Sequence, residues 1–154
     1  YGDHRDLHSF PTRRSSDLQA RLSPPLIGQV VAEASLDVPE DYLRDTYDEY
    51  VERRKCLIDG LNMIPGVYSP IPMGAFYTVA KLPVDDAEKF CAWCLSDFEY
   101  EGETVFMAPA AGFYTTPGLG VNEVRIAYVL NKRDLNRALF VLSKALEAYP
   151  GKTE

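Results

Sequence analysis

One arginine, Arg125, stands inside an otherwise apolar run, Val124–Val129 (VRIAYV). The run is rich in β-forming residues and predicts a strand that is covered on both faces. A guanidinium buried there needs an anion, because an unpaired buried charge is strongly destabilising. Guanidinium geometry matches a carboxylate with two parallel hydrogen bonds, and the small Ala127 leaves room for a ligand. The sequence leaves two interpretations open: an Asp or Glu of the chain pairs with Arg125, or a carboxylate ligand does.

Two cysteines, Cys91 and Cys94, have the spacing of a redox motif (CAWC). A redox pair needs its first cysteine at a helix N-terminus that follows a strand, where the thiolate is stabilised. This pair falls in the middle of a predicted helix, so we expect both thiols to pack in the core. Cys56 is the only other thiol, and we expect no metal site. The loop 109–122 lacks the glycine spacing of a phosphate-binding loop.

Residues 1–18 (YGDHRDLHSFPTRRSSDL) match, codon by codon, the translation of a DNA sequencing adaptor. We interpret them as a non-native scar and exclude them from the fold. Both histidines, His4 and His8, lie in this scar. The remaining segment therefore has no histidine for a Ser-His-Asp or Cys-His mechanism, or for a histidine metal site. Because residue 19 follows the scar without a start methionine, we expect the natural protein to continue upstream.

Composition narrows the class of protein. The chain has 154 residues, 46% of them hydrophobic and 25% charged, which fits one globular domain or a fragment of a larger protein. The net charge is −7 with no basic block, so we expect no nucleic-acid partner. No apolar run is long enough to span a membrane, and no export signal is visible. Three cysteines without an export signal indicate free thiols and a cytoplasmic location.

Periodicity and punctuation predict four helices and three strands. The expected helices are 26–36, 39–63, 85–98 and 131–149, and the expected strands are 74–80, 104–107 and 124–130. Asn131 is expected to cap the last helix. This order favours an α+β fold, with a small sheet of three to four strands and helices packed on one face. The two strands that flank the loop 109–122 are expected to be neighbours.

Four motifs along the chain resemble the C-terminal segment of class I/II pyridoxal-phosphate-dependent aminotransferases. They are PMGAFY at 72–77, MAP at 107–109 followed by a glycine-containing loop, VRIAY at 124–128, and a helix that opens near residue 134. The family patterns are P-x-G-x-F-Y, a strand that ends in proline, and V-R-I/L-A/S-Y/F. The likeness covers essentially all of residues 19–149, and the nearest members are bacterial enzymes of the aspartate aminotransferase type.

The resemblance implies roles for three residues. Arg125 matches the family arginine that clamps the substrate α-carboxylate, and Gly74 and Phe76 match the small-domain wall near the substrate. The implied substrates are an amino acid and a 2-oxo acid, the implied cofactor is pyridoxal phosphate, and the implied assembly is a homodimer. The turn 22–25 resembles a loop that reaches the neighbouring subunit's cofactor pocket, and Ser23 and the preceding Arg21 are assigned no role.

The resemblance also implies a division of the chain. Residues 19–38 correspond to the end of the large domain and an interdomain helix, 39–150 to the small domain of the type I fold, and 151–154 to a tail. The Schiff-base lysine and the main phosphate-binding loop lie upstream in the family. Five lysines of this segment stand outside any suitable motif: Lys55, Lys81, Lys89, Lys132 and Lys144. We therefore expect this chain alone to hold no cofactor and to be inactive.

Two functions of different class follow. The first is the aminotransferase small domain, with Arg125 as the carboxylate clamp. The second is a stand-alone α/β binding or regulatory module in which Arg125 is structural. A severed domain would expose the apolar residues of the helix 26–36 and leave Arg125 without an acidic partner. A stand-alone module would cover that helix and pair Arg125 with a buried Asp or Glu.

Overall fold

The computed structural model describes residues 25–153 of the chain. The chain divides into two compact units, Tyr1–Leu43 and Arg44–Glu154. The described part of the first unit holds helix α2 (Leu26–Ala34), the 3₁₀ helix η1 (Ser35–Asp37) and the first residues of α3 (Glu40–Met63). The expected break before Pro39 is confirmed, since Val38 is extended between η1 and α3.

The second unit contains a three-stranded antiparallel sheet with the order β1-β3-β2. Strand β1 is Tyr77–Lys81, β2 is Ala108–Pro109, and β3 is Glu123–Ala127. The predicted α+β class, with a small sheet and packed helices, is confirmed. The chain before the loop 109–122 does pair with the strand after it, as predicted, but through Ala108–Pro109 rather than through 104–107.

The segment 104–107 is not the strand that the sequence predicts, because only the next two residues pair with β3. The Thr104 hydroxyl donates a 2.5 Å hydrogen bond to the carbonyl of Cys94, which holds the segment against helix α4 (Ala87–Ser96). Val105 and Met107 are nevertheless buried in the core. The segment is therefore tied to a helix rather than to the sheet.

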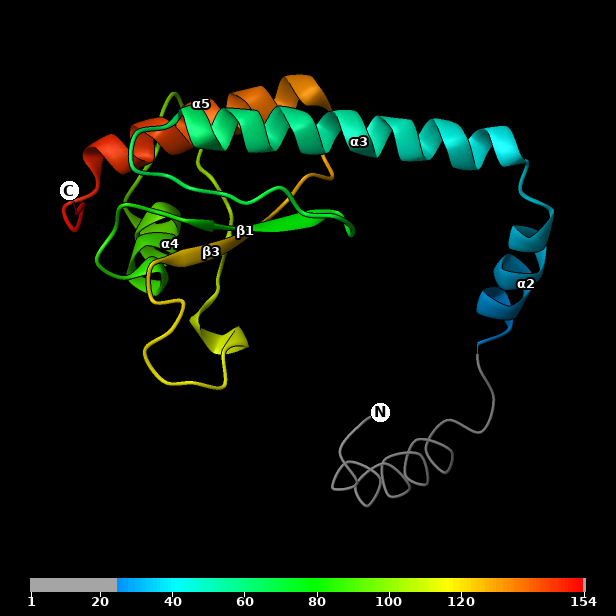
Figure 1. The fold of residues 1–154 in the computed structure, drawn as a ribbon, viewed down its shortest axis with the longest axis horizontal. Coiled ribbons are helices and arrows are strands. Elements are labelled where there is room, and N and C mark those ends of the chain that lie inside the picture. The colour runs from blue at the N-terminus through cyan, green and yellow to red at the C-terminus, as the bar shows by residue number, and fades with distance from the viewer. Residues whose placement is uncertain (1–24, 154) are drawn as a thin grey trace, which may run out of the picture. The chain divides into compact units, whose positions relative to one another are not determined.

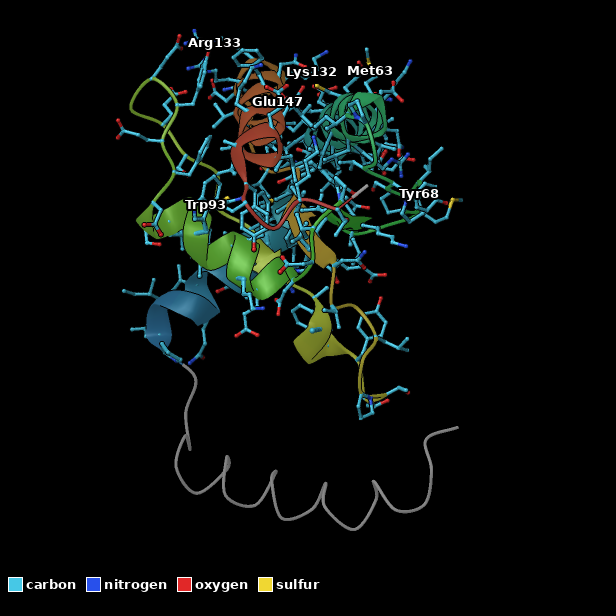
Figure 2. All side chains as sticks on the ribbon, turned by 90° about the vertical axis from the view of Figure 1, so that its left-hand side faces the viewer. Met63, Tyr68, Trp93, Lys132, Arg133 and Glu147 are labelled. Atoms are coloured by element: carbon cyan, nitrogen blue, oxygen red, sulfur yellow. The ribbon has the colours of Figure 1, made fainter. Side chains whose placement is uncertain are left out.

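Helices α3 and α5 (Lys132–Ala148) run side by side on one side of the sheet (Figures 1 and 2), while the loop 110–122 with the 3₁₀ helix η2 (Ala111–Phe113) lies on the other side. One core cluster joins α3, α4, α5 and the inner face of the sheet. Its most deeply buried large side chains are Leu61, Leu82, Phe90, Val124, Tyr128 and Leu135. Each such apolar side chain contributes about 1.5–3 kcal/mol by its burial.

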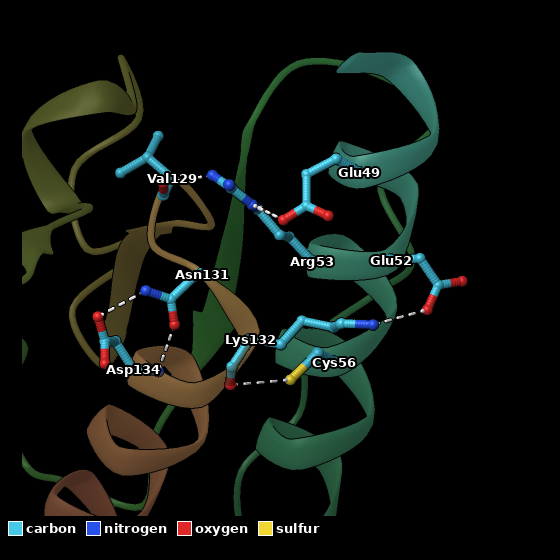
Figure 3. A network of polar contacts seen from close by, with 8 residues as sticks. All are labelled: Glu49, Glu52, Arg53, Cys56, Val129, Asn131, Lys132 and Asp134. Carbon is cyan, nitrogen blue, oxygen red and sulfur yellow. Dashed lines mark hydrogen bonds and ion pairs between the residues drawn. The ribbon is translucent and has the colours of Figure 1, made fainter. Parts of the chain in front are cut away.

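Polar side chains cap two of the core helices. Asp86 accepts hydrogen bonds from two backbone N–H groups in the first turn of α4. Asn131 accepts one from the backbone N–H of Asp134, as Figure 3 shows, which confirms the predicted cap of α5. Each cap satisfies N–H groups that have no partner within their own helix.

Within residues 25–153, no helix combines the length and the apolar character that crossing a bilayer requires.

Candidate functional site

Strand β3 presents Arg125 on the open face of the sheet. Val124 and Tyr128 are buried on the inner face, whereas Arg125 and Ala127 are exposed. The expectation of a strand covered on both faces is therefore wrong for this chain, because the described helices of the second unit cover only the inner face. The cross-strand neighbours of Arg125 are Val79 on β1 and Ala108 on β2. Neither neighbour carries a charge or a side-chain hydrogen-bonding group.

Two aromatic rings contact the Arg125 guanidinium. Its central carbon lies 5.4 Å from the centre of the Tyr77 ring and 4.9 Å from that of Phe113. Both distances fall within the range of a cation–π attraction. Among the described residues, no carboxylate and no hydrogen-bond acceptor pairs with Arg125. Its N–H donors are therefore available to an incoming anion.

The loop that carries Phe113 is tied to the start of β3. The Tyr114 hydroxyl donates a 2.5 Å hydrogen bond to the Glu123 carboxylate, and this bond raises the pKa of Tyr114. The backbone N–H of Ala110 donates to the Glu123 carbonyl at 2.8 Å. The Tyr114 ring also lies where a Cβ atom on Gly120 would stand, and Gly120 has a φ of +71°. Glycine at 120 thus lets the loop fold back on itself.

A tight turn, residues 74–76, precedes β1 and holds the other two predicted site residues. The buried Tyr128 donates its hydroxyl hydrogen bond to the Ala75 carbonyl at 2.9 Å, and its backbone N–H donates to the Phe76 carbonyl at 2.9 Å. Ala75 has a φ of +61°, a left-handed conformation that is costly for a residue with a Cβ atom. The Gly74–Phe76 turn is therefore bound to the strand of Arg125, with Gly74 and Phe76 both exposed.

Two adjacent arginines of α3, which the sequence analysis missed, anchor the same region. Arg53 donates to the Val129 carbonyl at 2.6 Å and to the Glu49 carboxylate at 2.7 Å (Figure 3). Arg54 donates to the Pro72 carbonyl at 3.1 Å. The segment after β3 and the segment before β1 are thus both held to α3. The only sequence signal was a run of four consecutive charged residues, 52–55, on a helix, which is typical of a solvated face.

The structure also places the two cysteines that the sequence analysis considered. Cys91 and Cys94 are buried in the core, as predicted, and burial raises the pKa of these thiols to about 11 and about 12. Both therefore remain protonated and unreactive at neutral pH. No group of three potential metal ligands occurs in the described part of the chain. Arg21 and Ser23 lie outside the described residues.

Comparison with known proteins points to one class of enzyme, although no family model matches the chain. It is 30% identical over 139 residues to an aspartate aminotransferase of Rhizobium meliloti, a match that covers 82% of this chain and 32% of the relative. An alanine aminotransferase from Pyrococcus furiosus superimposes with a TM-score of 0.68 and 27% identity, covering 85% of this chain and 32% of that one.

A third protein shares the fold at lower identity. It is the alpha-aminoadipate aminotransferase LysN from Thermus thermophilus, in complex with N-(5'-phosphopyridoxyl)-L-leucine, with a TM-score of 0.72 and 21% identity. The match covers 91% of this chain and 36% of that one. The chain spans about a third of the length of the curated relatives that it matches. Its homologues are aspartate aminotransferases, and the chain belongs to the aminotransferase family, consistent with a C-terminal segment of an aminotransferase.

Proposed function

We propose that this chain is the small-domain segment of a pyridoxal-phosphate-dependent aminotransferase, which transfers an amino group between an amino acid and a 2-oxo acid. In this proposal Arg125 binds the substrate α-carboxylate. The observation that carries it is the exposed Arg125 guanidinium, which contacts two aromatic rings and has no acidic partner among the described residues. The aminotransferase homologues support the reaction class.

Both substrates of a transamination carry the same group next to the reacting carbon. An amino acid and its 2-oxo acid each present an α-carboxylate, so one bidentate arginine serves both. The clamp holds the carboxylate and leaves the side chain of the substrate free. Gly74 and Phe76, at the entrance to β1, then form a wall beside the bound substrate.

We infer that the lysines of this chain form no site for pyridoxal phosphate. A Schiff-base lysine needs an uncharged amine, which a desolvated pocket favours. Here Lys132 and Lys144 instead form ion pairs with Glu52 and Glu147 at 3.3 Å and 2.8 Å. When bound, the cofactor supplies the electron sink for amino transfer. We propose that parts of the enzyme outside this chain hold it, and that the whole enzyme is a cytoplasmic homodimer.

The alternative, a stand-alone module with a structural Arg125, receives less support. It requires an acidic partner for Arg125, and the described residues provide none. It also requires the apolar side chains of α2 to be covered, yet the described part of its own unit buries no residue of α2. Ile27, for example, is 79% exposed. An apolar helix face that open is typical of a surface that another segment covers.

The experiment is a titration of the purified chain with pyruvate, a 2-oxo acid with one carboxylate, followed by NMR. Arg125→Gln removes the clamp and should weaken binding by about 10- to 100-fold, the value of a charge-assisted hydrogen bond. Arg133→Gln is the matched control, because the Arg133 side chain is 95% exposed and its one ion pair within residues 25–153 is with its neighbour Asp134. Equal affinities for wild type and Arg125→Gln would contradict the proposal.

A second measurement tests the cofactor assignment. The chain is incubated with pyridoxal phosphate and treated with borohydride, which reduces any imine to a stable amine. Its mass is then measured by mass spectrometry. We expect no specific adduct on a single lysine. A stoichiometric adduct at one lysine would show that this chain does provide a cofactor site.

A further inference from the structure

The Phe113 ring contacts the Arg125 guanidinium without using any of its hydrogen-bond donors. The guanidinium carbon lies 4.9 Å from the centre of the Phe113 ring, closer than to the ring of Tyr77. An aromatic ring attracts a cation through its π face and accepts no conventional hydrogen bond from it. An Asp or Glu at this place would also fix the guanidinium, but it would occupy the donors that a ligand carboxylate needs.

The two rings reach Arg125 from supports of different kinds. Tyr77 belongs to β1 and is fixed by the pairing of β1 with β3. Phe113 ends the short 3₁₀ helix η2, in the loop between β2 and β3. Only the loop determines where the Phe113 ring stands. The position of this ring therefore depends on how the loop is tied down.

The contacts of Tyr114, the next residue, tie it down. The Tyr114 hydroxyl donates a hydrogen bond to the carboxylate of Glu123, the first residue of β3. Glu123 stands two positions before Arg125 on β3, so the loop is bonded to the same strand that carries the guanidinium. The Tyr114 ring packs over Gly120, where any Cβ atom would collide with it. These contacts of Tyr114 fix the position of the neighbouring Phe113 relative to Arg125.

We propose that Phe113 is a positioning residue for Arg125, and that the hydrogen bond between Tyr114 and Glu123 sets its place. The inference rests on the proposed function, in which Arg125 binds the substrate carboxylate. A guanidinium that is already ordered loses less conformational freedom when the carboxylate arrives, and this raises affinity. The loop therefore contributes to carboxylate binding without touching the carboxylate.

The test compares Phe113→Leu with Phe113→Tyr in the same chain. Leucine removes the π face and should lower the affinity for pyruvate about two- to tenfold, as expected when one side chain must be ordered on binding. Tyrosine keeps the ring and should restore wild-type affinity. Phe106→Leu is the matched control, since Phe106 is 82% exposed and makes no ring contact with an arginine in the described part of the chain. Tyr114→Phe removes the hydroxyl that bonds to Glu123 and should also lower the affinity for pyruvate.

A spectroscopic signature separates positioning from a general loss of structure. The Nε–H proton of Arg125, assigned by its absence in Arg125→Gln, should lie at a ring-shifted position in wild type and in Phe113→Tyr. It should move toward the free-arginine position in Phe113→Leu, while the other amide signals stay in place. An unmoved Nε–H signal, or unchanged pyruvate affinity in Phe113→Leu, would overturn the role of Phe113. If Arg125→Gln itself binds pyruvate like wild type, the proposed function fails instead.

Discussion

Replacing Tyr128 by phenylalanine tests the link between the strand of Arg125 and the turn that holds Gly74 and Phe76. The substitution keeps the buried ring and removes only the hydroxyl, which donates to the Ala75 carbonyl at 2.9 Å. The loss of one such bond costs about 0.5–1.5 kcal/mol. Ala75 is exposed, so water can reach its carbonyl, and we expect a value near 1 kcal/mol.

The assay is urea unfolding followed by circular dichroism, with thermal unfolding as a second measurement. A loss of about 1 kcal/mol should lower Tm by roughly 3–6 °C for a unit of this size, with an unchanged urea slope. Tyr68→Phe is the matched control. Tyr68 is 63% exposed (Figure 2 labels it), and its hydroxyl has no partner among the described residues, so this variant should match wild type.

Two outcomes of this comparison would contradict the prediction. If Tyr128→Phe is as stable as Tyr68→Phe, the hydroxyl does not hold the turn, and the backbone bond from Tyr128 to Phe76 is sufficient. A loss above about 3 kcal/mol would indicate that the buried ring has repacked, because a single hydrogen bond does not account for so much. Burial raises the pKa of Tyr128, so the hydroxyl remains a donor well above neutral pH.

Three further predictions concern stability. Ala75→Gly should stabilise the chain by about 0.5–1 kcal/mol in urea unfolding, because glycine tolerates the φ of +61° that alanine does not; a loss of stability would contradict this. Asp86→Ala removes the cap of α4 and should lower the free energy of unfolding by about 1 kcal/mol, whereas Asp86→Asn should retain most of the stabilisation that the cap provides. Burial raises the pKa of the Cys91 and Cys94 thiols from 9.0 to about 11 and about 12, so the folded chain keeps protons that the unfolded chain releases. The contribution of these thiols to stability should therefore stay constant up to about pH 9 and be lost as pH rises from 9 to 12, and replacing both cysteines by alanine should reduce the fall in stability over that range.

Local signals in the sequence were enough to place the helices. The Asn131 cap of α5 depends on chemistry within four residues, and the structure confirms it. The burial of Cys91 and Cys94 likewise follows from their place on one face of α4. Interactions within one turn of a helix depend only on residues that are close together in the sequence, which explains why these predictions succeeded.

Two other features depend on long-range contacts that the sequence did not predict. The segment 104–107 has the residues of a strand, but its Thr104 hydroxyl bonds to α4 instead, ten positions back along the chain. The run around Arg125 suggested burial on both faces because Ala127 and Val129 are apolar. A strand that is covered on both faces and a strand with one open face can have the same amino-acid sequence. Only the packing of the helices distinguishes the two.

The contacts around Arg125 share one property that bears on its role. Tyr128 binds the turn before β1, Arg53 binds the carbonyl of Val129 after β3, and Tyr114 binds Glu123 at the start of β3. All three stabilise the strand or its neighbours, and none uses a donor of Arg125. A structural arginine would be expected to make such links itself, since its five donors suit that task. Here other residues hold the strand, and the guanidinium is left with its donors open, which is what binding a carboxylate requires.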